Sequence, residues 1–294
     1  MRYPPTDLPV TLPCVMGIVN VTPDSFSDGG QHADTDSAVA HGLLLAAEGA
    51  AILDVGGEST RPGSDPVAAN DELARVVPVI ERLAAASPAL ISVDTTKAVV
   101  AGAALDAGAV LVNDVTALRG DPAMAALVAE RGCPLCLMHM LGEPRTMQDD
   151  PRYDDVVGEV VAFLEERLAF AVAAGVREEQ ILLDPGIGFG KTVRHNLLLL
   201  AHLDRIAALG RPIVLGASRK RFIGALLGAE PGERAVGTVA TTVLGLARGA
   251  AIVRVHDVRP NVEALRVAQA ILDADLADLA DGDAVAAAGR RSPL

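Results

Sequence analysis

The sequence predicts a single (β/α)₈ TIM barrel, an α/β fold in which eight parallel strands alternate with helices. Eight short apolar segments recur along the chain, each followed by an Ala- and Leu-rich stretch with helical periodicity. The apolar segments are continuous rather than alternating, which is typical of strands buried on both faces of a parallel sheet. The length of 294 residues also suits one barrel, since such barrels commonly contain roughly 250 residues. An open doubly wound sheet is the alternative, and eight successive strand–helix units favour the closed barrel.

The individual elements follow from these patterns. Strands are predicted at residues 14–19, 51–55, 89–93, 110–115, 134–138, 181–184, 212–217 and 251–255. Helices are predicted at 36–48, 70–86, 96–107, 121–131, 153–174, 193–208, 221–249 with a break near Pro231, and 261–279. Residues 1–13 would form an N-terminal extension and residues 14–279 the barrel. Residues 280–294 are rich in Ala, Asp and Gly without a periodic face, which predicts a flexible C-terminal tail.

The composition excludes several classes of partner. A formal net charge of −13 argues against general binding to nucleic acid or to an anionic membrane, although a small basic pocket could still bind an anionic substrate. The N-terminus has no apolar core of a signal peptide, and no apolar run is long enough to span a bilayer. Three cysteines do not make a disulfide framework, so we expect a reduced, cytoplasmic protein.

Polar residues stand at the carboxyl ends of the predicted strands, one group at each end. They are Asn20, Asp54, Asp94, Asn113 with Asp114, His139, Asp184, Ser218 to Lys220, and Arg254 with His256. A closed barrel brings the carboxyl ends of its strands together on the face that carries the active site. Helix capping explains some of the Asp, Asn and Ser residues. It does not explain Lys220, Arg254 or His256, so the set predicts a functional site.

Two motifs favour a structural interpretation. The segment DPGIGFGKT at 184–192 follows a strand and opens a helix, but Pro185 stands where a phosphate-binding P-loop needs glycine. Its glycines would instead let the backbone approach a flat ligand closely. The Cys133-Pro-Leu-Cys136 pair lies on a strand, where the two side chains would point to opposite faces, and no second pair completes a zinc site.

The strand-end residues suggest two kinds of recognition. Asp94, Asn113 and Asp184 offer carboxylate and amide groups that would bind a polar heterocycle with ring N–H and amino donors. Arg61, Lys220, Arg254 and His256 could form an anion-binding group, in which Arg254 and His256 share one strand face. His139 follows an apolar run and is interpreted as an interior histidine or a pocket wall, with a direct chemical role as the alternative.

Two long connections stand outside the strand–helix rhythm. Residues 20–35 and 57–69 are rich in Gly and Pro, and connections of this length in a compact barrel are usually functional.

These segments together resemble the dihydropteroate synthase family. MGIVNVTPDSFSDGG (16–30) and ILDVGGESTRPG (52–63) are similar to its two signatures. SVDTT, VNDV, LMHM-x-GEPRTMQ, LDPGIGFGKT, GASRKRF and VRVHDV then follow in the family's order, each at a strand end. The resemblance covers nearly the whole barrel. It implies an enzyme that joins a dihydropterin diphosphate to p-aminobenzoate, with release of pyrophosphate in folate synthesis.

The resemblance also implies roles for individual residues. For the pterin the implied residues are Asp94, Asn113, Asp184 and Lys220, with Arg254 over the ring. For the diphosphate they are Thr60, Arg61, Arg254 and His256, with Asn20 as a ligand of Mg²⁺. For p-aminobenzoate they are Phe26, Pro62, Phe189 and Lys220. Asp28, Asp94 and Lys220 would act in catalysis, and the family implies a homodimer for which helices 233–249 and 261–279 are candidate faces. Arg221 stands where many members carry serine, an extra cation that would suit the p-aminobenzoate carboxylate.

Two other functions share part of this pattern. A pterin-binding methyltransferase barrel would use the same aspartates and asparagine, but it does not need the cationic set or the DSFSDGG segment. A catalytically silent pterin-binding paralogue would be expected to have lost loop residues, yet Asp28, Thr60 and Arg61 are all present.

Overall fold

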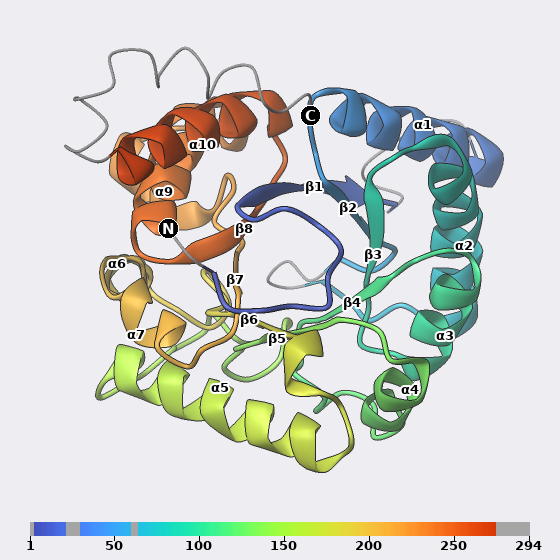
Figure 1. The fold of residues 1–294 in the computed structure, drawn as a ribbon, viewed down its shortest axis with the longest axis horizontal. Helices are drawn as coiled ribbons and strands as arrows, with labels where there is room; N and C mark the ends of the chain where they lie inside the picture. The colour runs from blue at the N-terminus through green and yellow to red at the C-terminus, as the bar shows by residue number, and fades with distance from the viewer. Residues whose placement is uncertain (1–2, 22–29, 60–63, 275–294) are drawn as a thin grey trace.

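The chain folds into one closed barrel of eight parallel strands in sequence order, as predicted (Figure 1). The computed structural model describes residues 3–21, 30–59 and 64–274. The strands are β1 (Cys14–Asn20), β2 (Ile52–Gly56), β3 (Leu90–Asp94), β4 (Leu111–Asp114), β5 (Leu135–Met138), β6 (Ile181–Asp184), β7 (Ile213–Leu215) and β8 (Ala250–Val255).

Helices follow the strands and surround the barrel (Figure 1). They are α1 (Gly30–Ala47), α2 (Ala69–Ala86), α3 (Ala98–Asp106), α4 (Met124–Arg131), α5 (Val156–Ala173), α6 (Val193–Ala201), α7 (Leu203–Ala207), α8 (Arg221–Leu227), α9 (Ala235–Ala247) and α10 (Val258–Asp273). Short 3₁₀ turns, η2 (Glu178–Gln180) and η3 (Pro231–Glu233), precede β6 and α9. The turn η3 lies at the break predicted near Pro231.

Both faces of the strands are buried, which accounts for their continuous apolar runs. One core cluster lies between strands and helices and includes Val93, Leu135 and Ile213. A second cluster contains other residues of the same strands, such as Met16, Ile52 and Cys136, each fully buried. Since alternate residues of a strand point to opposite faces, this second cluster fills the barrel interior.

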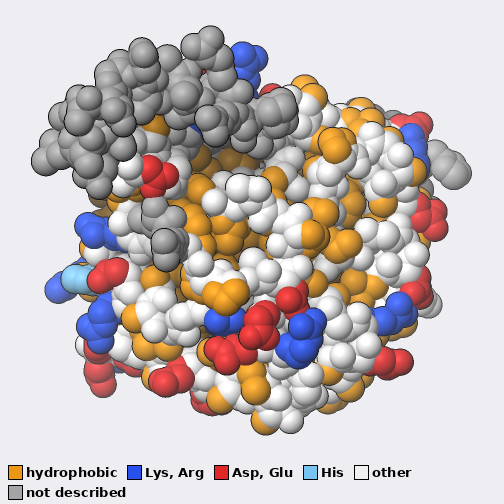
Figure 2. Space-filling view, viewed as in Figure 1, with side chains coloured by type: hydrophobic (Ala, Val, Ile, Leu, Met, Phe, Trp, Pro, Cys, Tyr) orange, Lys and Arg blue, Asp and Glu red, His pale blue; other side chains and the backbone are white. Residues whose placement is uncertain are grey.

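The N-terminal extension closes one mouth of the barrel. Leu8 is buried in the interior cluster, and Tyr3, Val10 and Leu12 pack against it. The Asp7 N–H donates to the Glu179 carbonyl at 2.9 Å. Figure 1 shows this dark-blue segment crossing the barrel opening. In the same view hydrophobic side chains gather towards the middle of the face, with charged ones mainly near its rim (Figure 2).

Several predicted element bounds are wrong. The helix α1 begins at Gly30, inside the predicted 20–35 connection, because the polar residues after Gly30 include no further Gly or Pro to stop a helix. The predicted helix 193–208 is divided at His202, whose backbone (φ −122°) leaves the helical region. The helix α10 ends at Asp273 rather than 279, and Ala274 has extended backbone. The strand β7 spans only three residues of the predicted six.

The cysteines are packing residues. All three are free and buried. Cys133 and Cys136 belong to different core clusters, so the spacing does not bring their side chains to one site. Burial raises the pKa of the Cys133 thiol to about 11 and also raises that of Cys136. Among the helices that the structure describes, none is long and apolar enough to cross a membrane.

Candidate active site

An ionic network joins four strands at the carboxyl end of the barrel. Arg254 on β8 donates from Nε to Asp54 Oδ2 at 2.6 Å and from a terminal nitrogen to Asp94 Oδ2 at 2.8 Å. Asn113 on β4 donates from Nδ2 to the same Asp54 oxygen at 3.1 Å. The β-sheet register places Asp94 beside both Gly56 and Asn113, which aligns these side chains. Asp94, Asn113 and Arg254, predicted from separate strand ends, are therefore brought together.

The second oxygen of Asp54 is an unused acceptor. Asp54 is fully buried, and its Oδ1 has no hydrogen-bond partner among the described residues. Leaving such an acceptor unpaired is costly, so it marks a position where a bound donor would be stabilised. Asp54 is predicted at a strand end, but no role in the site is predicted for it. The sequence feature that indicates a role for Asp54 is a carboxylate inside an otherwise apolar strand.

Opposing effects act on the charge of Asp94. Burial raises the pKa of its carboxyl, the Arg254 guanidinium lowers it and Asp54 raises it, and together these effects bring the pKa to about 7. The pKa of Arg254 is raised: burial lowers it, but the Asp54 and Asp94 carboxylates outweigh that effect. Because Arg254 stays protonated, the network holds one fixed cation between two carboxylates.

Asp184 and Lys220 lie on the opposite side of the barrel end. A Cβ built on Gly216 would lie 3.6 Å from Asp184 Oδ2 and 3.9 Å from Lys220 Nζ, so both side chains border this glycine. Lys220 Nζ also lies 4.5 Å from the centre of the Phe189 ring and donates to the Ile187 carbonyl. Burial lowers the pKa of Lys220 to about 8, and Asp184 opposes this shift.

The glycines of the 185–192 connection allow two parts of the protein to approach closely. Gly186 and Gly190 have positive φ, and a Cβ on Gly186 would lie 1.8 Å from the His139 carbonyl oxygen. A Cβ on Gly190 would lie 2.7 Å from Leu141 atoms. These two glycines thus let the connections after β5 and β6 pack against each other. The predicted approach of this backbone to a flat ligand stays a prediction.

His139 is an interior residue held by a lysine that the sequence analysis missed. The buried Lys191 Nζ lies 2.8 Å from His139 Nδ1 and donates to the Phe189 carbonyl at 3.0 Å. Burial, together with the nearby Lys191 charge, lowers the pKa of His139 to about 2. The histidine is therefore neutral, and Lys191 fixes the connection that carries Phe189.

The Ser218–Lys220 connection is held in a strained form. Arg219 has a φ of +55°, which is unfavourable for a side-chain-bearing residue. Its N–H donates to Thr238 Oγ1 at 3.0 Å, its carbonyl accepts from Arg234 at 3.0 Å, and its guanidinium pairs with Asp257 at 2.9 Å. These contacts fix the backbone that presents Lys220.

The three described members of the predicted anion-binding group contact different partners. His256 lies against Ser218, with its Nδ1 3.0 Å from the Ser218 hydroxyl. Arg254 faces the carboxylates and Lys220 faces Phe189, since each cation is paired with its own nearby acceptor or ring. Arg61, the fourth member, lies outside the described residues.

The remaining predicted residues are distributed as follows. Asn20 ends β1 and pairs with Gly56 in the sheet. Asp114 accepts from Thr116 and Leu118 and so shapes its own turn. Arg221 begins α8. Phe26, Asp28, Thr60 and Pro62 also lie outside the described residues.

A cleft opens beside Asp94. Its wall comes from the connections after β2, β3, β4 and β5, and its lining residues are Glu58, Ser59, Ser64, Pro66, Asp94, Thr95, Thr96, Val115, Thr116, Glu143, Pro144 and Arg145. Within the ranges the structure describes, no three His, Cys, Asp or Glu residues are grouped to hold a metal ion by themselves.

The chain is similar to known proteins over almost its whole length. A family model described as pterin binding enzyme matches residues 16–256. The dihydropteroate synthase of Escherichia coli K12 is 48% identical over 92% of this chain and 95% of its own length. The Mycobacterium leprae dihydropteroate synthase is 52% identical, over 88% of this chain and 94% of its own length.

Solved structures agree with these sequence relatives. Xanthomonas albilineans dihydropteroate synthase with 4-aminobenzoic acid has a TM-score of 0.85 and 53% identity, covering 90% of this chain and 94% of that one. The Yersinia pestis enzyme in a sulfonamide complex has a TM-score of 0.87 and 44% identity, covering 93% and 100%.

Proposed function

The chain belongs to the pterin-binding enzyme family, as one of its dihydropteroate synthases, and we propose how its site performs the condensation. The substrates would be a 7,8-dihydropterin carrying a CH₂-diphosphate group and p-aminobenzoate. The carbon–oxygen bond to the diphosphate breaks, the aniline nitrogen bonds to the CH₂ carbon, and the amine loses a proton. The products are 7,8-dihydropteroate and pyrophosphate.

The observation that carries this proposal is the unpaired acceptor inside an acidic cluster. Asp54 Oδ1 is buried without a partner among the described residues, next to the Asp94 and Asn113 side chains. A dihydropterin presents adjacent ring N–H and amino donors, which are the groups that such acceptors require. Asp184 adds a further carboxylate on the opposite side, and Lys220 beside it a donor.

The same groups suit the electronic demands of the reaction. As the diphosphate departs, the pterin CH₂ carbon gains positive charge, which the Asp94 carboxylate stabilises. Arg254 and His256, with Thr60 and Arg61, would stabilise the leaving diphosphate. The aniline amine is a neutral nucleophile, so no strong general base is required. Asp28, in the connection 20–35, would also act in catalysis.

A magnesium ion fits this site only together with the substrate. Asn20 supplies one amide oxygen at the end of β1, and the described residues contain no protein-only metal cluster. Mg²⁺ commonly takes one or two protein oxygens and completes its shell with phosphate and water. We propose that Asn20 holds the ion against the diphosphate, where it would neutralise the leaving group.

The p-aminobenzoate slot would lie beside Lys220. The Phe189 ring, stacked under the Lys220 ammonium, would form one wall, with Phe26 and Pro62 as further parts. Arg221, at the start of α8, adds a cation suited to the p-aminobenzoate carboxylate.

Binding would be ordered, with p-aminobenzoate entering after pterin, pyrophosphate and Mg²⁺. The connections 20–35 and 57–69 contribute residues to both the diphosphate site and the aryl slot. Filling the diphosphate site would therefore help to form the aryl slot. Calorimetry would test this: tight p-aminobenzoate binding to the ligand-free protein would contradict it.

We further propose a cytoplasmic homodimer formed by α9 and α10. Val236 and Leu244 on α9 are 80% and 60% exposed, and Val267 and Ile271 on α10 are 62% and 69% exposed. Large exposed apolar side chains on adjacent helices are typical of protein interfaces. Sedimentation of the wild type and a Val236→Glu variant would test this, and a monomeric wild type would contradict it.

Pyrophosphate release that depends on p-aminobenzoate is the decisive assay for the function. A methyltransferase barrel or a silent paralogue would release none, while this chain is expected to release one pyrophosphate for each dihydropteroate formed.

A further inference from the structure

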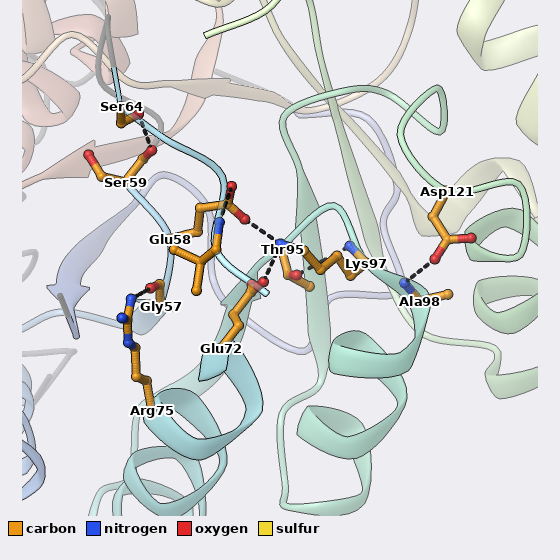
Figure 3. Close-up of polar contacts among 11 residues, drawn as sticks. Gly57, Glu58, Ser59, Ser64, Glu72, Arg75, Thr95, Lys97, Ala98 and Asp121 are labelled. Carbon is orange, nitrogen blue, oxygen red and sulfur yellow. Dashed lines mark hydrogen bonds and ion pairs between the residues drawn. The ribbon is translucent and has the colours of Figure 1, made fainter. Parts of the chain in front are cut away.

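A half-buried lysine bridges two acidic side chains outside the ionic network of the site. Lys97 Nζ donates to Glu72 Oε2 at 2.6 Å and to Glu58 Oε2 (Figure 3). Glu58 lies in the connection after β2, Glu72 in the first turn of α2, and Lys97 in the connection after β3. The bridge therefore ties two strand-to-helix connections to the helix between them.

The bridge depends on the lysine charge. Glu72 is fully buried, whereas the side chains of Lys97 and Glu58 are 23% and 22% exposed. Removing the cation would leave two carboxylates facing each other with no counterion, one of them out of contact with solvent. We therefore expect Glu58, the more exposed of the two, to move away when Lys97 is neutralised.

Glu58 in turn holds together the two ends of its connection. Its Oε1 accepts from the Val67 N–H at 3.3 Å, nine residues further along the chain. Ser64 donates to the Ser59 carbonyl, and Arg75 of α2 donates to the Gly57 carbonyl at 2.8 Å (Figure 3). These contacts give the described parts of the connection a defined path along α2.

The held connection borders the substrate cleft. Glu58, Ser59 and Ser64 line the cleft together with Asp94, and Lys97 follows Asp94 by only three residues. The Lys97 N–H donates to Thr95 Oγ1 at 3.3 Å, and the Thr95 N–H donates to the Asn113 carbonyl at 3.1 Å. Lys97 is thus linked on one side to the pterin-binding strands and on the other to the cleft wall.

We propose that Lys97 is a positioning residue for the pterin substrate, which it serves by fixing Glu58 and with it the cleft wall beside Asp94. This role rests on the proposed function. We assign it to the pterin because Glu58 lines the cleft together with Asp94, whereas the bridge contacts neither Phe189 nor Lys220. Pro62, the part of the proposed p-aminobenzoate slot that belongs to the same connection, lies outside the described residues.

The test is a split between two Michaelis constants. Lys97→Met should raise KM for the pterin diphosphate about tenfold or more while changing kcat and KM for p-aminobenzoate less than about threefold. Lys97→Arg keeps the charge and should restore most of the loss. Arg131→Met removes a matched cation, paired with Asp106 at 2.7 Å between α3 and α4, and should change none of these constants. Equal losses for both substrates, or an unchanged pterin KM, would overturn the proposal.

A double variant separates the bridge from its charge. Lys97→Met with Glu72→Gln restores the net charge of the wild-type trio but not the contact to Glu58, so its pterin KM should stay raised. Recovery of the wild-type KM would show that charge alone matters and would refute positioning through Glu58.

Two further measurements test the proposal even if Lys97→Met does not fold or the proposed function is refuted. If Lys97→Met does not fold, Glu58→Gln keeps an acceptor for the Val67 N–H, weakens the lysine contact and should still raise the pterin KM; an unchanged KM would overturn the proposal. Wild-type protein without p-aminobenzoate-dependent pyrophosphate release would refute the proposed function instead. In that case calorimetric binding of the dihydropterin alcohol to the wild type and to Lys97→Met still tests the positioning role, and equal affinities would overturn it.

Discussion

Arg254 and Asp94 form an ion pair of 2.8 Å that joins β8 to β3, two strands separated by β1 and β2 in the barrel. The same guanidinium reaches Asp54 on β2. One cation thus serves two carboxylates that we assign to the pterin. Binding of the pterin would compete for these carboxylates and allow Arg254 to turn towards the ring and the diphosphate.

Asp94→Asn should reduce turnover at least about 100-fold and weaken pterin binding. The amide replaces the charge that stabilises the developing cation, an interaction worth roughly 2–4 kcal/mol. Steady-state kinetics with the pterin diphosphate would measure the loss. Turnover within about threefold of wild type would remove Asp94 from its catalytic role.

Replacing His256 or Arg254 with alanine should weaken binding of the diphosphate substrate far more than binding of the free pterin alcohol. Both side chains are assigned to the leaving group, which the alcohol lacks. Arg254→Ala should also affect the alcohol somewhat, because its loss leaves Asp54 and Asp94 without their cation. Calorimetry with both ligands would decide, and equal losses would show that these residues hold something else.

The pH dependence of kcat/KM for the pterin diphosphate should be bell-shaped. Asp94 acts as a carboxylate, and its pKa is raised to about 7, so activity should fall as the pH drops through that region. Lys220 acts as a cation, and its pKa is lowered to about 8, so activity should also fall as the pH rises through that value. Lys220→Arg should move the alkaline limb to higher pH. If the alkaline limb does not move, a group other than Lys220 causes it.

Cys133→Ser with Cys136→Ser should leave activity unchanged under both reducing and oxidising conditions. Both thiols are buried with raised pKa values, and little thiolate is available for oxidation. Assays with and without a thiol reductant would measure this. A redox response present in the wild type and lost in the double variant would revive a functional role for the pair.

The strands and the position of the site could be predicted because the information is local. A strand buried on both faces must be largely apolar, and a polar residue at its last positions must lie at the carboxyl end of the barrel. Eight such units in order therefore determined both the barrel and the face that carries Asp94, Asn113, Asp184 and Arg254. Helix ends were less predictable. The polar residues after Gly30 are compatible with either loop or helix, so their local pattern does not fix where α1 begins.

The pairing of side chains across the barrel was decided only by the tertiary structure. The sequence indicates that Arg254 lies near several carboxylates, but not that it selects Asp54 and Asp94 over Asp184, because that choice depends on how the closed barrel staggers its strands. In the sequence, Lys97 is an ordinary residue before a helix. Only the packing of α2 places the buried Glu72 against it. The need for glycine at Gly186 comes from the connection after β5, which packs against it only in the folded barrel. Each contact joins residues far apart in the chain, and a local pattern cannot specify a distance that barrel closure alone determines.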